Sequence, residues 1–307
     1  MSQYTQSQPI KPTFARHETF HPRYGWLKKG FDKNEVFSKE KDRARVVLGV
    51  GQNMVNAIRY WCLAFKILEE DNGDRINSYE PTQFGLKLLS TKGWDPYLED
   101  PATLGLLHWN LFKPPCYATA WYFVFNEFNK VSFTTDDLLF SLKEYIHRSY
   151  PSNKTKDSSF KRDLNCILRM YVEKKSSKSL KEATIDCPFT DLGLITAYND
   201  SRKYAFNFGN KPILSNEIVV SACLEFSSRF ENSSRTISIS SLLYDSGSPG
   251  QVFKLTESSL CDSIEKVSEY FEEILISDTA GMIQFSYKND PTILSNTLLD
   301  SYYKKDK

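Results

Sequence analysis

Apolar and polar positions follow a helical period on both sides of a short glycine turn near residue 50, and they predict a first folded unit. Apolar side chains recur three and four positions apart through residues 51–65, which is the spacing of one helix face. Residues 42–48 predict a preceding helix, and the turn's glycines can adopt positive φ angles. A hairpin is predicted across residues 66–80, and Thr82 is suited to cap the short helix after it. Helix, turn, helix and hairpin in this order are typical of a winged helix-turn-helix unit.

A weaker version of the same order follows in the middle of the chain. Residues 135–148 predict a helix that Thr135 is suited to cap. After a polar linker, residues 160–171 carry an apolar stripe at helical spacing. Alternation at residues 194–208 then predicts a hairpin. These elements predict a second winged-helix-like unit.

The C-terminal third predicts one more unit of this kind. Residues 216–230 predict a helix, a turn is predicted at 247–250, and residues 257–274 predict a long amphipathic helix. A hairpin about a Thr-Ala-Gly turn is predicted for residues 274–288.

Residues 96–133 lie between the first and second units, and they are dense in aromatic side chains and interrupted by Pro114 and Pro115. This composition predicts buried helices that join the units. We therefore expect a mainly α fold with small β-hairpins, made of tandem winged helix-turn-helix-like modules and a helical, aromatic-rich connector. The expected divisions are residues 1–95 with an N-terminal arm, 96–133, 134–212 and 213–307.

Charge is distributed unevenly, although the formal net charge is only +1. Residues 1–66 hold twelve Lys or Arg and five Asp or Glu, and residues 148–178 hold nine and three. Residues 67–110, between them, hold three and eight. Because salt screens distant charges, the local field of a basic patch decides phosphate binding. Two such patches favour a nucleic-acid partner, and the alternative is that they are solvated helix faces.

Several classes of protein are excluded by what the sequence lacks. No apolar run approaches the roughly 20 residues of a membrane span, and the N-terminus has no signal-peptide pattern. No membrane contact and a cytoplasmic location are expected. The six scattered cysteines form no Cys-x-x-Cys pair, which predicts buried free thiols. Neither a P-loop nor a Gly-x-Gly-x-x-Gly fingerprint is present, so no nucleotide cofactor is expected.

The polar face of the predicted helix at residues 51–65 carries side chains that can read base edges. Asn and Gln can bond adenine through two contacts, and Arg can do so with guanine. Basic residues nearby are suited to grip phosphates, and residues 160–171 hold a second, less specific group. The alternatives are a winged helix used for protein contacts and an ordinary solvated helix face. The candidate DNA-binding residues are Lys28, Lys29, Arg43, Arg45, Gln52, Asn53, Asn56, Arg59, Tyr60, Lys161, Arg162 and Arg169.

The segment at residues 16–30 concentrates groups that can do chemistry, and it supplies the catalytic candidates His17, Glu18 and Arg23. A His and a carboxylate can hold a divalent metal or move protons, and Arg can offset charge that develops on a phosphate. The alternative is a structural arm whose polar groups pin the first module. The residues alone assign no metal ligands. His108 lies among apolar residues and is expected to be a core histidine.

Taken together, seven motifs resemble a bacterial family of unknown function. They run in order from about residue 14 to residue 290 and are HETFHPRYGWLKKGFD, LGVGQNMVNAIRYWCLAF, GWDPYLEDPATLGLLHWNL, FKRDLNCILRMY, DCPFTDLGLI, LLYDSGSPGQVFKL and DTAG. The characterised branch of this family is the SspB type, which acts in systems that place sulfur in the DNA backbone. The resemblance implies a DNA-nicking or strand-opening component of a DNA phosphorothioation and anti-phage defence system.

The leading hypothesis from the sequence is therefore a DNA nickase with Mg²⁺ or Mn²⁺ as its cofactor. The resemblance implies a cysteine desulfurase and a sulfurtransferase related to PAPS reductase as partners. Double-stranded DNA and a second copy in a homodimer are the other expected partners. One alternative is a non-catalytic DNA-binding adaptor that recruits the sulfur enzymes, and another is a transcriptional regulator. An adaptor would bind DNA without metal and leave it intact.

Overall fold

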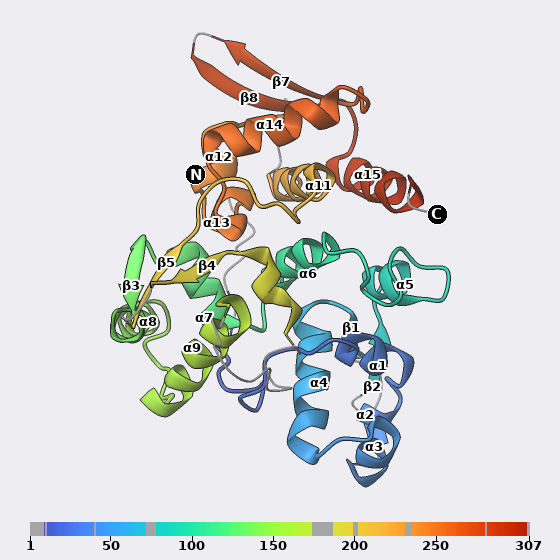
Figure 1. The fold of residues 1–307 in the computed structure, drawn as a ribbon, viewed down its shortest axis with the longest axis vertical. Helices are drawn as coiled ribbons and strands as arrows, with labels where there is room; N and C mark the ends of the chain where they lie inside the picture. Colours follow the sequence, from blue (N-terminus) through green and yellow to red (C-terminus); the bar gives the residue numbers. More distant parts are fainter. Residues whose placement is uncertain are drawn as a thin grey trace.

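Helices make up most of the chain, and three small antiparallel sheets lie among them (Figure 1). The computed structural model describes residues 9, 11–39, 41–71, 78–173, 187–198, 202–230, 235–279 and 281–305. The expectation of a mainly α fold with small β-hairpins is confirmed.

The N-terminal unit has the predicted order of helix, turn, helix, hairpin and helix. Its elements are α1 (Trp26–Asp32), α2 (Val36–Lys39), α3 (Lys41–Leu48), α4 (Gln52–Ala64), β1 (Leu68–Asp71), β2 (Ser78–Pro81) and α5 (Gln83–Leu89). Helix α4 buries Ile58, Trp61 and Cys62 on one face, as their spacing predicts. Thr82 caps α5 by accepting the N–H of Gly85, as predicted. The expected hairpin turn at residues 71–74 starts at the last residue of β1, and its other residues lie outside the described residues.

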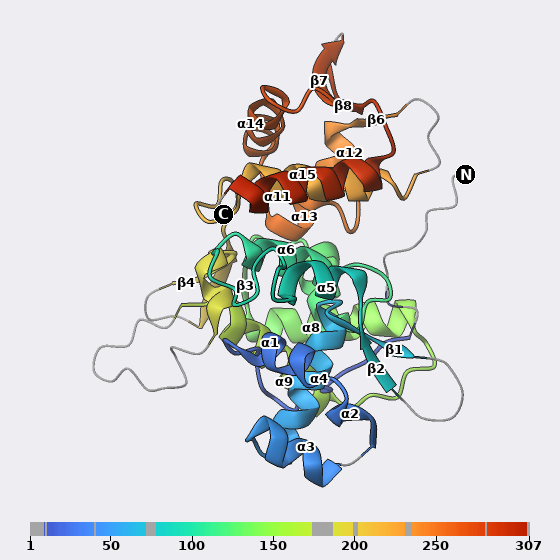
Figure 2. The ribbon, with the colours of Figure 1, turned by 90° about the vertical axis from the view of Figure 1, so that its right-hand side faces the viewer.

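The connector lies at the centre of the molecule. It consists of α6 (Thr103–Leu111), α7 (Thr119–Tyr122) and the π-helical turn η1 (Phe123–Glu127). Every residue of α6 is buried, because this helix lies between the C-terminal unit and the two other units (Figures 1 and 2). A Cβ atom at Gly105 would collide with the side chain of Leu214, so glycine lets the C-terminal unit approach α6 closely. The prediction of buried connecting helices is confirmed.

The middle unit forms around the second sheet. Its elements are β3 (Ser132–Thr134), α8 (Thr135–Ser149), α9 (Asp157–Tyr171), the 3₁₀ turn η2 (Pro188–Leu192), β4 (Ile195–Ala197) and β5 (Lys203–Phe206). The predicted cap Thr135 is wrong, because Thr135 is already helical and Thr134 is the N-cap. The Thr134 hydroxyl accepts the N–H of Asp137, and the Asp137 carboxylate accepts the N–H of Thr134.

The C-terminal unit forms around the third sheet. Its elements are α11 (Asn216–Ser227), β6 (Thr236–Ser238), α12 (Ile239–Tyr244), α13 (Pro249–Phe253), α14 (Glu257–Ser268), β7 (Ile274–Thr279), β8 (Met282–Tyr287) and α15 (Pro291–Lys305). The predicted helix at 257–274 is too long, since α14 ends at Ser268 and residue 274 begins β7. The predicted turn at 247–250 contains the start of α13. Helix α15, which the sequence reasoning missed, packs against α11.

The middle and C-terminal units share one topology. In both three-stranded sheets the last strand lies in the centre, with orders β3-β5-β4 and β6-β8-β7. In both, helices separate the first strand from the hairpin formed by the other two. The first unit differs in its described part, where its sheet contains only β1 and β2. The two sheets therefore have the same strand order, and α9 and α14 are each the last α-helix before the hairpin of their unit.

Buried contacts of the connector fix these units to one another. The Nδ1 atom of His108 lies 2.8 Å from the Tyr171 hydroxyl of α9, and its Nε2 atom lies 3.0 Å from the Val252 carbonyl of α13. Complete burial lowers the pKa of His108 to about 3, so the ring is neutral at pH 7. Trp94 stacks on Tyr303 with ring centroids 5.3 Å apart, which attaches α15 to the segment after α5. His108 is thus a core histidine with both nitrogens bonded, as expected.

Two further expectations can be compared with the structure. All six cysteines are free thiols, and five of them are buried. In the part of the chain that the structure describes, no helix combines the length and apolar character that crossing a membrane would require.

Two alanine variants test which threonine caps α8. Replacing Thr134 with Ala removes both hydrogen bonds of the Thr134 hydroxyl with Asp137. We expect the free energy of unfolding to fall by about 1 kcal/mol, measured by urea denaturation. Thr135→Ala is the matched control and should change it by less than about 0.5 kcal/mol. The reverse order of the two effects would contradict the assigned cap.

Candidate nucleic-acid interface

Helix α9 has one buried face and one basic, exposed face. Phe160, Leu164, Ile167, Leu168 and Tyr171 are buried at helical spacing. Between them, four polar side chains point outward along one line, and they are Lys161, Arg162, Asn165 and Arg169. Because apolar burial fixes the rotation of the helix about its axis, this sequence necessarily presents the four together.

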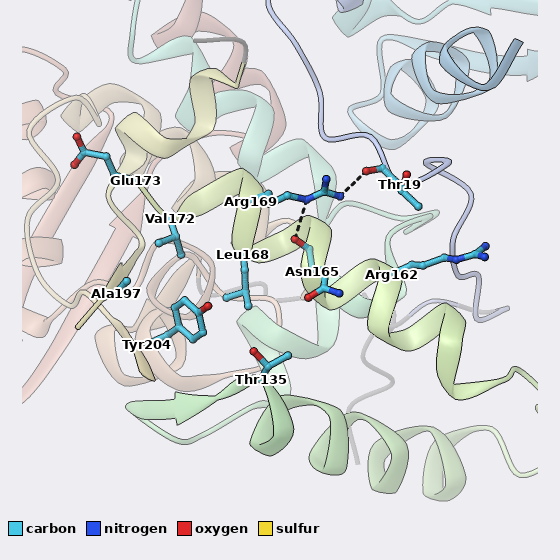
Figure 3. Close-up of a pocket in the computed structure, with 10 residues that line it drawn as sticks. All are labelled: Thr19, Thr135, Arg162, Asn165, Leu168, Arg169, Val172, Glu173, Ala197 and Tyr204. Carbon is cyan, nitrogen blue, oxygen red and sulfur yellow. Dashed lines mark hydrogen bonds between the residues drawn. The ribbon is translucent and has the colours of Figure 1, made fainter. Parts of the chain in front are cut away.

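Lys161 and Arg162 are available for an external partner. Neither side chain forms an ion pair with any residue in the described ranges. Arg169, one turn away from Asn165, is held in place, because its guanidinium donates to the carbonyls of Thr19 and Asn165 (Figure 3). A fixed arginine and two available cations on one face are well suited to phosphate contacts.

A cavity of about 860 Å³ borders this face. It is lined by α9, by the β4–β5 hairpin, by the start of α8 and by Thr19 of the N-terminal arm. The lining residues are Thr19, Thr135, Arg162, Asn165, Leu168, Arg169, Val172, Glu173, Ala197 and Tyr204. Figure 3 shows Leu168, Tyr204 and Thr135 around one space with the Asn165 amide beside it, whereas Arg162 extends away.

The N-terminal arm, residues 11–25, holds the inner side of α9. Asp163 is the buried carboxylate of this helix, with 2% of its surface exposed. It accepts the N–H of Ala15 at 2.8 Å and lies 2.8 Å from the Nε2 atom of His17. Burial raises the pKa of Asp163, and these hydrogen bonds oppose the shift. The edge of Phe14 meets Phe160, so polar and apolar contacts attach the arm to α9.

The three catalytic candidates do not share one site. His17 is completely buried against Asp163 and between aromatic rings, with Trp121 at 5.4 Å. The Glu18 carboxylate faces α4, while the Arg23 guanidinium lies 5.4 Å from the ring of Trp26. This placement gives His17 a direct structural role in positioning the arm.

The polar face of α4 lies beneath this arm. Asn56 donates to the Glu18 carboxylate at 3.2 Å, and Tyr60 donates to the Tyr117 carbonyl at 3.4 Å. The Arg59 guanidinium lies 5.6 Å from the ring of Tyr79. All three α4 side chains are only partly exposed. They line a cleft of about 740 Å³ between the arm, α4 and the hairpin. Reading bases with α4 would therefore require the arm to move.

The other candidates of the N-terminal unit are dispersed. Lys28 forms an ion pair with Asp32 at 2.7 Å, and Lys29 donates to the carbonyl of Leu48. Arg43 lines a separate cavity of about 520 Å³ beside β2. Of the remaining three candidates, Arg45 and Asn53 are exposed, and Gln52 donates to Asn56.

The equivalent helix of the C-terminal unit has the opposite charge. Glu257, Asp262 and Glu265 are exposed on α14, and Lys266 is its single exposed cation. Glu269 extends the acidic surface just beyond the helix. Two units of one topology thus present surfaces of opposite charge.

Few metal-ligand side chains lie together in the described part of the chain. Among the described residues, no three His, Cys, Asp or Glu side chains lie together as a metal-binding group. The arm cleft does gather oxygen donors, because Glu18, Glu70 and Asn56 all line it. Mg²⁺ prefers such oxygen ligands and is commonly held by one or two carboxylates with water and phosphate.

Comparison with known proteins places the chain in a family. The model of the family described as "Protein of unknown function (DUF4007)" matches residues 14–303. The chain belongs to this family. Among curated proteins nothing matches this chain.

Two solved structures are similar to this chain over nearly its whole length. The first, described as "SspB crystal structure", is 32% identical with a TM-score of 0.86 and covers 97% of this chain and 90% of its own. The second, described as "Magnesium ion-bound SspB crystal structure", is 32% identical with a TM-score of 0.88 and covers 99% and 91%. The expected resemblance to the SspB type is confirmed.

The stability of a His17 variant tests the structural role of the buried pair. His17→Ala leaves the Asp163 carboxylate buried with one hydrogen bond fewer. We expect the free energy of unfolding to fall by about 3 kcal/mol, measured by urea denaturation. His147→Ala, which removes an exposed histidine of α8, is the matched control. It should lower the free energy of unfolding by less than about 0.5 kcal/mol. Equal stability of the two variants would mean that His17 does not hold the arm.

Proposed function

We propose that this chain is a duplex-DNA-binding protein of a bacterial DNA phosphorothioation system, and that α9 with the β4–β5 hairpin is its main DNA-contacting surface. The observation that carries the proposal is the outward line of Lys161, Arg162, Asn165 and Arg169 on α9. The similarity to SspB supports the assignment to a phosphorothioation system, which the sequence motifs also imply.

The topology of the middle unit supports a winged helix-turn-helix mode of binding. In such units the second helix enters the major groove, and the hairpin lies beside it as a wing. Here α9 is the second helix after β3, and β4–β5 is the hairpin. Arg162 and Asn165 would face base edges, since Arg recognises guanine and Asn adenine. Lys161 and Arg169 would contact phosphates.

The C-terminal unit would have a different partner. Its acidic α14 would be repelled by phosphates, although this helix, like α9, is the last α-helix before the hairpin of its unit. In the adaptor alternative, this unit contacts the sulfur-transfer enzymes while the middle unit holds DNA. We infer that one topology serves two kinds of partner in this chain.

Metal-dependent nicking is a second candidate function, favoured by the arm cleft. The cleft contains Glu18 and Glu70 together with Arg59, and a similar structure is described as magnesium ion-bound. Glu18 and Glu70 would hold the ion. Bound there, Mg²⁺ would polarise a phosphate and lower the pKa of a coordinated water. Arg59 would offset negative charge on the same phosphate.

Neutralising the face of α9 tests DNA binding. Arg162→Ala should weaken binding of duplex DNA by about 1–3 kcal/mol, measured by fluorescence anisotropy. Lys161→Ala should weaken it less, and uniformly across sequences, with a shallower salt dependence. Lys266→Ala on α14 is the matched control and should leave affinity unchanged. If Lys266→Ala weakens binding and Arg162→Ala does not, the C-terminal unit is the DNA-binding one.

Incubation with supercoiled plasmid separates the nickase from the adaptor. With Mg²⁺ or Mn²⁺, a nickase converts the plasmid to open circles, and EDTA stops it. Glu18→Gln should then lower the rate at least about a hundredfold, because it removes the negative charge of a proposed metal ligand. His147→Ala is the control. A plasmid that is shifted in a gel but stays supercoiled would support the adaptor and contradict nicking.

A further inference from the structure

The cavity beside α9 has an apolar floor, which a surface that only grips phosphates does not need. Leu168 and Val172 form this floor from α9 and the residue after it, and Ala197 and Tyr204 form a wall from the hairpin. These side chains lie next to the most basic face of the unit, within reach of bound DNA in the proposed mode. An apolar cavity floor beside a charged face is typical of a ligand site.

We propose that this cavity accepts a nucleobase that has left the DNA stack. The inference rests on the proposed DNA contact of α9. An unstacked base needs a flat apolar or aromatic surface, a polar group for its edge and cations for its phosphates. Tyr204 with Leu168 supplies the surface, the Asn165 amide supplies the polar group, and Arg169, which also lines the cavity, supplies a cation for the phosphates (Figure 3).

The size and construction of the cavity suit this occupant. Its volume of about 860 Å³ is within the range of about 300–1,000 Å³ of small-ligand pockets, and it is open to solvent. Tyr204 is fixed by strand pairing opposite Phe133, and the two ring centroids lie 6.1 Å apart. Arg169 is fixed by its bonds to Thr19 and Asn165. A pre-formed wall reduces the entropy that binding would otherwise lose.

Three otherwise identical duplexes test the inference by fluorescence anisotropy. One is fully paired, one contains a single unpaired base, and one has an abasic position at that place. We expect the duplex with the unpaired base to bind about tenfold more tightly than the other two. Tighter binding of both altered duplexes would mean that the protein selects flexible DNA and would overturn the base pocket. Equal binding of all three would also overturn it.

Variants of the cavity link this preference to named side chains. Tyr204→Ala should abolish the tenfold preference, so that the duplex with the unpaired base binds no more tightly than the paired duplex, while Tyr204→Phe should keep the preference because the ring remains. Asn165→Ala should reduce the preference for an unpaired base without abolishing it. A preference that survives Tyr204→Ala would overturn the assignment to this cavity. Failure to bind even the paired duplex would instead refute the proposed function.

Discussion

The buried carboxylate of Asp163 is the contact on which the arrangement of α9 depends. It faces inward, where it accepts the N–H of Ala15 and lies 2.8 Å from the Nε2 atom of His17. An unpaired carboxylate in that position would be strongly destabilising, so α9 and the arm need each other. With Asp163 fixed inward, the helix period places Lys161, Arg162 and Asn165 outward. The orientation of the proposed DNA-binding face therefore depends on the buried contacts of Asp163, which lie away from the surface.

The arm also connects the two cavities that could engage nucleic acid. Thr19 borders the cavity beside α9, and Glu18, one residue earlier, borders the cleft over α4. His17 of the buried pair, Glu18 and Thr19 are consecutive residues. Displacement of the arm at one cavity would therefore also change the other cavity. Nicking at the arm cleft and base capture beside α9 would consequently depend on the same segment of the arm.

Repetition of a topology does not repeat its chemistry. The sheets β3-β5-β4 and β6-β8-β7 have the same order, yet α9 presents cations and α14 presents carboxylates. The fold alone would favour neither unit as the DNA contact, and in our proposal the side-chain charge of α9 decides for the middle unit. The central α6, buried on all sides, keeps the two surfaces at fixed positions.

Helical periodicity predicted most of this fold, because burial of one face is a local property of the sequence. It predicted α4, α8 and α9, and it missed α15, whose packing partner α11 is remote in the chain. The predicted cap, Thr135, was one residue away from the actual cap, Thr134, because periodicity does not distinguish two adjacent threonines. The covering of Asn56 by Glu18 is a long-range contact that no spacing reveals. Asn165 was overlooked although it lies four residues from both Lys161 and Arg169.

Hydrogen–deuterium exchange with and without duplex DNA tests the central claim most directly. If α9 and the β4–β5 hairpin form the DNA contact, amides of residues 157–171 and 203–206 should exchange more slowly in the complex, and those of 257–268 should not change. Slower exchange in 257–268 with no change in 157–171 would contradict the account and assign DNA to the C-terminal unit.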